Sequence, residues 1–160
     1  MIKTNNKHGM AEQRRLFMKL MNANFDTPVI IVRDYENLSE EEFQLQASTD
    51  LGALLLDGLG DGVFLRATNC GNEQMKIQTA FGILQATRTR ISKTEYISCP
   101  SCGRTLFDLQ ETTAKIRSKT SHLKGLKIGI MGCIVNGPGE MADADYGYVG
   151  TGDGLSLIHI

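Results

Sequence analysis

The length, composition and charge of this chain limit what it can be. Its 160 residues are 41% hydrophobic and 22% charged, enough for one apolar core, or for one core and part of a second. Seventeen basic and eighteen acidic residues give a formal net charge of -1, so no molecule-wide field favours nucleic acid or an anionic membrane. No segment resembles a signal peptide or a membrane helix of roughly 18 apolar residues, so we expect a cytoplasmic protein.

Helix-like and strand-like patterns alternate through the first part of the chain. Ser39 followed by Glu42 forms a capping box, and the apolar residues after it recur at helical spacing. In chain order, we expect a helix over 11–25, a strand over 29–32, a helix over 43–55, a strand over 63–65 and a helix over 77–84. This alternation predicts an α/β fold with a largely parallel or mixed sheet.

A second group of elements follows a polar, basic stretch near residues 91–93. Thr105 and Asp108 have the spacing of another capping box, which predicts the start of a helix that carries Leu106 and Leu109. The further expected elements are a strand over 95–98 that leads into Cys99, a strand over 126–131 that leads into Cys133, and a strand over 146–149. Two of the four cysteines are therefore expected at strand ends.

The cysteines carry the strongest chemical signal in the sequence. In a chain without a secretory signal, thiolates bind metals or perform redox chemistry more often than they form disulfides. Cys70 lies in a polar turn without a nearby partner, and we expect it to be a free structural thiol. Cys99 and Cys102 form a Cys-x-x-Cys turn, and such a pair can bind one metal centre.

From these residues alone, three kinds of site stay open at the cysteine pair. A zinc knuckle needs four good ligands, and only Cys133 is a clear addition to the pair. A dithiol redox pair would not need Cys133. The glycine-rich loop over 132–140 favours the third kind, an iron–sulfur cluster, because it supplies Cys133 together with the carboxylate of Glu140. Three soft ligands and one hard, exchangeable ligand suit a cluster that admits substrate at one iron.

The two cysteine segments resemble those of the 4-hydroxy-3-methylbut-2-enyl diphosphate synthase family. The resemblance is carried by Cys99-Pro100-Ser101-Cys102-Gly103-Arg104 and by Gly132-Cys133-Ile134-Val135-Asn136-Gly137-Pro138-Gly139-Glu140. Further upstream, Asp57-Gly58-Leu59-Gly60-Asp61 and Phe81-Gly82-Ile83-Leu84-Gln85 are similar to the longer, three-domain members of the family. The resemblance spans about residues 29–150.

This resemblance implies a [4Fe–4S] cluster bound by Cys99, Cys102, Cys133 and Glu140, with Asn136 against the substrate and Glu140 as a catalytic ligand. It also implies reductive ring opening of 2-C-methyl-D-erythritol 2,4-cyclodiphosphate, a step of the non-mevalonate isoprenoid pathway. The electron donor would be ferredoxin or flavodoxin, and the location the cytoplasm, or the plastid stroma in a plant-like source. The full-length enzyme could also be a homodimer. The alternative function is a zinc-binding interaction module that uses the Cys-x-x-Cys turn.

The resemblance also predicts the domain organisation. Residues 1–92 would be the end of a barrel-like insertion domain, and residues 93–154 an incomplete iron–sulfur domain similar to the small α/β domain of sulfite and nitrite reductases. Residues 155–160 would be a tail outside the family pattern. In that case the strand over 146–149 would keep an open edge, and the chain would not turn over alone.

Overall fold

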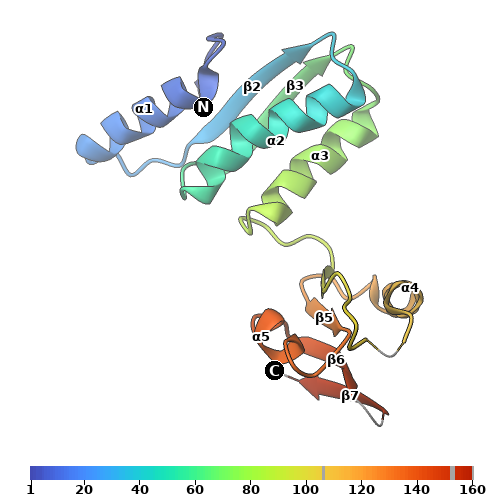
Figure 1. The fold of residues 1–160 in the computed structure, drawn as a ribbon. Coiled ribbons are helices and arrows are strands. Elements are labelled where there is room, and N and C mark those ends of the chain that lie inside the picture. The colour runs from blue at the N-terminus through green and yellow to red at the C-terminus, as the bar shows by residue number, and fades with distance from the viewer. Residues whose placement is uncertain (106, 152–153, 160) are drawn as a thin grey trace. The chain divides into compact units, whose positions relative to one another are not determined.

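The computed structural model describes residues 1–105, 107–151 and 154–159, and the chain divides into two units, Met1–Arg90 and Ile91–Ile160. Both units combine helices with a sheet, as the sequence predicts (Figure 1). Among the described residues, no helix has both the length and the apolar character needed to cross a bilayer.

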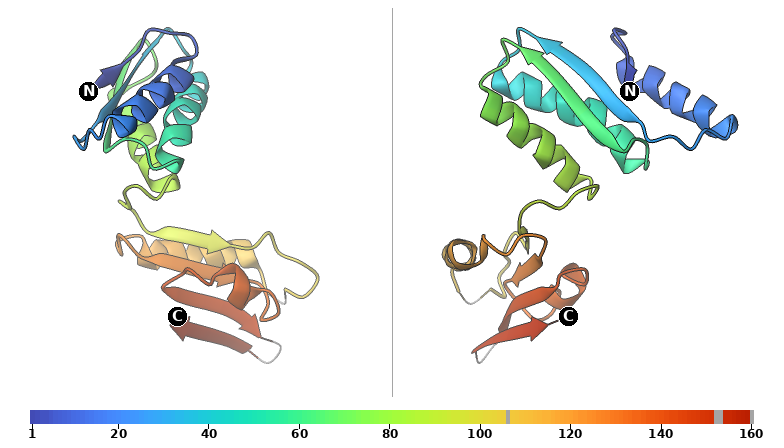
Figure 2. Two further views of the ribbon diagram at one scale, coloured as in Figure 1. Left: turned by 90° about the vertical axis from the view of Figure 1, so that its left-hand side faces the viewer. Right: turned by 180° about the vertical axis from the view of Figure 1, so that it is seen from behind.

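The first unit consists of three consecutive strand–helix pairs. Its elements are β1 (Ile2–Lys3), α1 (Gly9–Asn22), β2 (Ile30–Glu36), α2 (Glu40–Leu56), β3 (Gly62–Thr68) and α3 (Glu73–Ala86). The strands are parallel in the order β1-β2-β3, and α2 and α3 lie side by side on one face of β2 and β3 (Figures 1 and 2). The first expected helix is correct in kind, but it ends at Asn22 rather than at residue 25.

One apolar core holds this unit together. The capping box that begins α2 is confirmed, because Glu42 N donates to Ser39 Oγ at 3.2 Å and Ser39 N donates to a Glu42 carboxylate oxygen at 2.9 Å. The helix that begins there buries Phe43, Ala47, Leu51, Leu54 and Leu55, whereas Leu45 and Leu56 are exposed. The fully buried side chains of this core are Ile31, Phe43, Ala47, Leu51, Leu54 and Cys70.

The second unit is a four-stranded sheet with two helices. Its elements are β4 (Glu95–Ser98), α4 (Leu109–Thr120), β5 (Lys127–Met131), α5 (Gly137–Glu140), β6 (Tyr146–Thr151) and β7 (Gly154–His159). The sheet order is β4-β5-β6-β7, in which β4, β5 and β6 are parallel and β7 is antiparallel to β6 (Figure 2). The prediction of a strand over residues 95–98 is confirmed.

Two predictions for the second unit are wrong. The strand β6 does not keep an open edge, because β7 pairs with it from Tyr146↔His159 to Thr151↔Gly154 and satisfies its free backbone groups. The helix α4 is not begun by a capping box of Thr105 and Asp108. Asp108 is itself the N-cap, and its carboxylate accepts a hydrogen bond from Glu111 N at 2.8 Å. Leu106, residues 152 and 153 of the expected iron–sulfur domain, and residue 160 of the expected tail lie outside the described residues.

Candidate metal centre

Two adjacent parallel strands bring the first and third cysteines of the motif together. Ser98 at the end of β4 is in register with Ile130 near the end of β5. Because the carboxyl ends of parallel strands meet at one edge of a sheet, Cys99 and Cys133 leave the sheet on the same side. Gly132 N donates to Cys99 Sγ at 3.3 Å, which joins the two strand ends directly.

The residues expected at the site from the sequence surround a single cavity. It has a volume of about 130 Å³. Its lining consists of Cys99, Pro100, Ser101, Cys102, Met131, Cys133, Asn136, Gly137 and Glu140. The structure therefore brings together all three thiols of the motif, the carboxylate and the amide that the sequence singled out.

Glycines let the short helix α5 approach β5 closely. A Cβ on Gly137 would lie 2.9 Å from Met131 Cβ and 3.3 Å from Val149 Cγ1, and one on Gly129 would lie 2.7 Å from Met141 Cβ. No side chain larger than hydrogen fits at either position without displacing α5. The short helix separates Asn136, at its N-cap, from Glu140, at its last residue, and both line the cavity.

The turn that carries Cys102 is fixed to the loop that carries Cys133. Thr105 N donates to Cys102 O at 2.9 Å, and Cys102 N donates to Thr105 Oγ1 at 3.3 Å. The Thr105 hydroxyl packs directly on Gly132, where any Cβ would overlap it. The second thiol of the pair is thus held beside Cys133 by packing and hydrogen bonds that the protein itself provides.

The electrostatics around Cys133 favour its thiolate. Hydrogen bonds from the backbone N–H groups of Asn136 and Val135 lower the pKa of Cys133 to about 7, and the Arg104 side chain adds to this effect. The same contacts, with Cys133 and Cys102, raise the pKa of Arg104. The thiolate is the form of cysteine that binds a metal, so the loop favours the ligating state of Cys133.

Arg104 affects the site electrostatically, although its residue pattern alone did not predict this. It lies two positions after Cys102, and its interaction with the thiols of Cys133 and Cys102 raises the pKa of its guanidinium. A basic residue directly after a Cys-x-x-Cys-Gly turn is a signal that could have identified it. Its role was not predicted because Cys133, the thiol with which Arg104 interacts most strongly, is distant in sequence.

The donor set combines three soft thiol ligands with one hard carboxylate around a single cavity. A zinc ion draws four ligands to about 2.0–2.3 Å from one point. In the part of the chain that the structure describes, no three His, Cys, Asp or Glu side chains are grouped closely enough to hold one metal ion. Instead, Cys99, Cys102, Cys133 and Glu140 are spread around a cavity.

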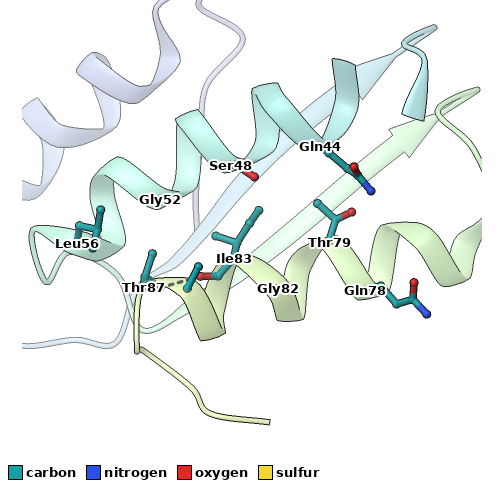
Figure 3. Close-up of a pocket in the computed structure, with 10 residues that line it drawn as sticks. Gln44, Ser48, Gly52, Leu56, Gln78, Thr79, Gly82, Ile83 and Thr87 are labelled. Atoms are coloured by element: carbon teal, nitrogen blue, oxygen red, sulfur yellow. Dashed lines mark hydrogen bonds between the residues drawn. The ribbon is translucent and has the colours of Figure 1, made fainter. Parts of the chain in front are cut away.

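The largest of the cavities described here offers no comparable chemistry. A groove of about 440 Å³ runs between α2 and α3 of the first unit (Figure 3). Its lining consists of Gln44, Ser48, Gly52, Leu56, Gln78, Thr79, Gly82, Ile83, Ala86 and Thr87. None of these side chains is an acid, a base or a soft metal ligand. The remaining cysteine, Cys70, is a free thiol that is fully buried in the core of the same unit.

Comparison with known proteins identifies the segment that holds this site. Residues 95–159 match the GcpE protein C-terminal domain. Over these residues the chain is similar to the GcpE family. The match includes both cysteine motifs and β7, so it extends past the point where the sequence analysis placed the end of the family pattern.

Curated relatives of this chain confirm the resemblance seen in the two motifs. A 4-hydroxy-3-methylbut-2-en-1-yl diphosphate synthase (flavodoxin) from Parabacteroides distasonis is 60% identical over 154 residues, which is 96% of this chain and 25% of that protein. The flavodoxin-type synthase of Porphyromonas gingivalis is 59% identical over 145 residues, 91% of this chain and 25% of that protein. A chloroplastic, ferredoxin-type synthase from Oryza sativa is 53% identical over 148 residues, 92% of this chain and 20% of that protein. The chain thus spans about a quarter of the length of the curated relatives it matches.

Proposed function

We propose that this chain is the cluster-binding segment of a 4-hydroxy-3-methylbut-2-enyl diphosphate synthase. The observation that carries the proposal is the single cavity around which Cys99, Cys102, Cys133 and Glu140 meet. In this proposal the four residues bind a [4Fe–4S] cluster. The full-length enzyme reductively opens the ring of 2-C-methyl-D-erythritol 2,4-cyclodiphosphate to give 4-hydroxy-3-methylbut-2-enyl diphosphate. The activity for which the relatives are named supports this assignment.

Each side chain of the site has a distinct part in the proposal. The bound cluster supplies single electrons and a Lewis-acidic iron. The N–H groups of its own loop lower the pKa of Cys133 to about 7 and so favour its thiolate, and Cys99 accepts a hydrogen bond from Gly132 N. Glu140 is exposed at the end of α5, so its carboxylate can withdraw without disturbing a buried core. Asn136 is exposed beside it and can donate hydrogen bonds to the oxygens of a bound anion.

The proposal extends to partners and domains of the full-length enzyme. Flavodoxin or ferredoxin, named in the activities of the relatives, is the electron donor. The consecutive parallel order β1-β2-β3 is consistent with part of a barrel-like domain. The second unit is then the iron–sulfur domain, of the type found in sulfite and nitrite reductases. The full-length enzyme works in the cytoplasm, or in the plastid stroma in a plant-like source.

Metal analysis tests this proposal against the zinc-binding alternative. A full-length synthase that contains this segment is purified without oxygen, and its iron, sulfide and zinc contents are measured. About four irons and four sulfides per chain are expected from the [4Fe–4S] assignment. Stoichiometric zinc without sulfide would overturn it and leave the interaction module. A dithiol oxidoreductase would retain activity in a Cys133→Ala variant, whereas the synthase would not.

The role of Glu140 has a test of its own. A Glu140→Cys substitution in the full-length enzyme should preserve iron and sulfide while turnover with a chemical reductant falls on the order of 100-fold. The reason is that a thiolate is a softer ligand for iron and leaves it less readily than a carboxylate. Glu111→Cys, another exposed glutamate of the same unit, controls for the added thiol and should leave both readouts unchanged. Full activity of the Glu140→Cys enzyme would remove the exchangeable-ligand role.

A further inference from the structure

The helix α4 and the turn that follows it carry a basic surface. Residues 112–127 contain five Lys and Arg residues and no Asp or Glu. The exposed cations of this segment, called here the α4 basic surface, are Lys115, Arg117, Lys119 and Lys124. Among the residues that the structure describes, only Lys115 of these four has an acidic ion-pair partner, Glu111, at an N–O distance of 2.7 Å. The second unit therefore leaves most of this positive charge without a neutralising carboxylate.

The cations lie on both sides of an exposed stripe of small residues. Ala114 and Ser118 are four residues apart, so they lie above one another on the solvent side of α4, and both are exposed. At 100° per residue, Arg117 lies on one side of this stripe and Lys119 on the other. The Arg117 guanidinium is held over the Tyr96 ring at 4.9 Å from its centroid. A partner can therefore approach the helix closely and meet positive charge on both sides.

The packed side of α4 reaches the core that contains one of the proposed ligands. Leu109 and Ile116 of α4 belong to the same apolar cluster as Cys99. The residues that line the site cavity, however, include none from α4. A protein bound on the outer surface of α4 would thus lie against the same small unit as the site, without competing with a substrate for the cavity residues.

We propose that the α4 basic surface is the docking site of the electron donor, a flavodoxin that presents an acidic face. This inference rests on the proposed function and adds to it a surface for the donor. Flavodoxin is the donor in the names of the two bacterial relatives described above. Opposite charges on two proteins steer their encounter and fix their orientation, and they speed association more than they strengthen the complex. A carrier that has to bind and leave in every turnover suits a surface of this kind.

The experiment uses a full-length synthase that contains this segment, purified without oxygen. A Lys119→Glu/Lys124→Glu variant reverses two charges of the α4 basic surface, and Arg117 is left unchanged because it stacks on Tyr96. Turnover is measured with increasing reduced flavodoxin, and separately with reduced methyl viologen, a small molecule that needs no docking surface. The matched control is Lys7→Glu/Lys19→Glu, which makes the same change in net charge at two exposed lysines of the first unit. Lys19 also lies in the last turn of its helix, as Lys119 does.

The expected result is a KM for flavodoxin that rises about tenfold in Lys119→Glu/Lys124→Glu. Iron content and turnover with methyl viologen should stay at the wild-type level, and the control variant should match wild type in all three measurements. Higher salt should raise the KM of the wild-type enzyme more than that of the variant, because salt screens the charges that the variant has lost. An unchanged KM for flavodoxin in Lys119→Glu/Lys124→Glu overturns the inference.

The remaining outcomes are also decisive. If the variant loses turnover equally with both reductants, α4 serves folding or contacts another part of the enzyme, and the docking site is overturned. Turnover of the wild-type enzyme with a ferredoxin but not with flavodoxin overturns the choice of partner. If the wild-type enzyme lacks iron and sulfide, the proposed function itself fails, whereas an unchanged KM in an enzyme with its full iron content removes only the docking site. The two failures are therefore distinguishable.

Discussion

The two units of this chain are stabilised in different ways. The first has one continuous core, in which large side chains such as Phe43, Leu51 and Leu54 are fully buried under α2 and α3. The second has two smaller apolar clusters, and its close contacts are made by glycines, such as Gly132 against Thr105 and Gly137 against Met131. The first unit is built to bury apolar surface, whereas the second is built to bring polar and sulfur groups to one edge.

This difference indicates where function should be sensitive to substitution. A core residue of the first unit contributes to stability through the apolar surface it buries. In the second unit, a small change in the backbone moves ligands that have to meet at one cavity. Equivalent substitutions made in both units should therefore separate effects on stability from effects on the site.

The largest contrast is expected between two cysteines. In a full-length synthase, Cys133→Ala should abolish turnover and reduce the iron and sulfide content, because it removes one of three thiolates that line the cavity. Cys70→Ala should leave iron, sulfide and turnover unchanged, because Cys70 is buried in the core of the first unit and its thiol only donates to Thr68 O at 3.2 Å. Equal iron loss in both variants would contradict the assignment of the site.

Two amides provide the next contrast. Asn136 lines the site cavity, and Gln78 lines the groove between α2 and α3. In a full-length synthase, Asn136→Ala should lower turnover on the order of 100-fold, the usual effect of removing one donor to a reacting anion, while the iron content is preserved. Gln78→Ala should change neither the turnover nor the iron content. Iron loss in Asn136→Ala that matches the loss of turnover would make Asn136 a structural residue.

A third contrast lies within α5. Gly137→Ala should lower the free energy of unfolding of the second unit by about 1–3 kcal/mol, because its Cβ would meet Met131 Cβ at 2.9 Å. Gly139→Ala is the matched control, since a Cβ there meets nothing within 4 Å. Chemical denaturation of this chain measures the free energy of unfolding of both variants. An unchanged stability for Gly137→Ala would show that α5 can move away from β5 at no cost.

Local sequence signals predicted a large part of this structure. The capping box at Ser39 and the strand over residues 95–98 were correct because hydrogen bonds and apolar periodicity within a few residues determine them. The placement of Cys99 and Cys133 at strand ends followed from the same patterns. The meeting of both at one cavity required only that β4 and β5 be parallel neighbours.

What the sequence did not predict depends on contacts between distant segments. The short strand β1 exists because Ile2 and Lys3 pair with Ile31 and Val32, and a strand of two residues has no pattern of its own. The strand β7 is defined by its pairing with β6. Thr105 looked like part of a helix cap, but its side chain packs on Gly132 instead.

The smallest expected effects come from the two helix caps, which also test whether the units unfold separately. Ser39→Ala and Asp108→Ala each remove an N-cap acceptor, so each should lower the free energy of unfolding by about 1 kcal/mol. Because the chain divides into two compact units, Ser39→Ala should shift only the transition of the first unit, and Asp108→Ala only that of the second.

The capping box adds a pH dependence to this last comparison. Hydrogen bonds from the Ser39 backbone N–H and hydroxyl lower the pKa of Glu42 below its ordinary value. Its contribution is therefore present above that ordinary value, about 4.3 in unfolded chains, and is lost as the pH falls through the lowered pKa of the folded state. In hydrogen exchange followed by mass spectrometry from pH 7 to pH 3, the cost of Ser39→Ala should shrink toward acid. A constant cost would mean that Glu42 takes no part in the cap.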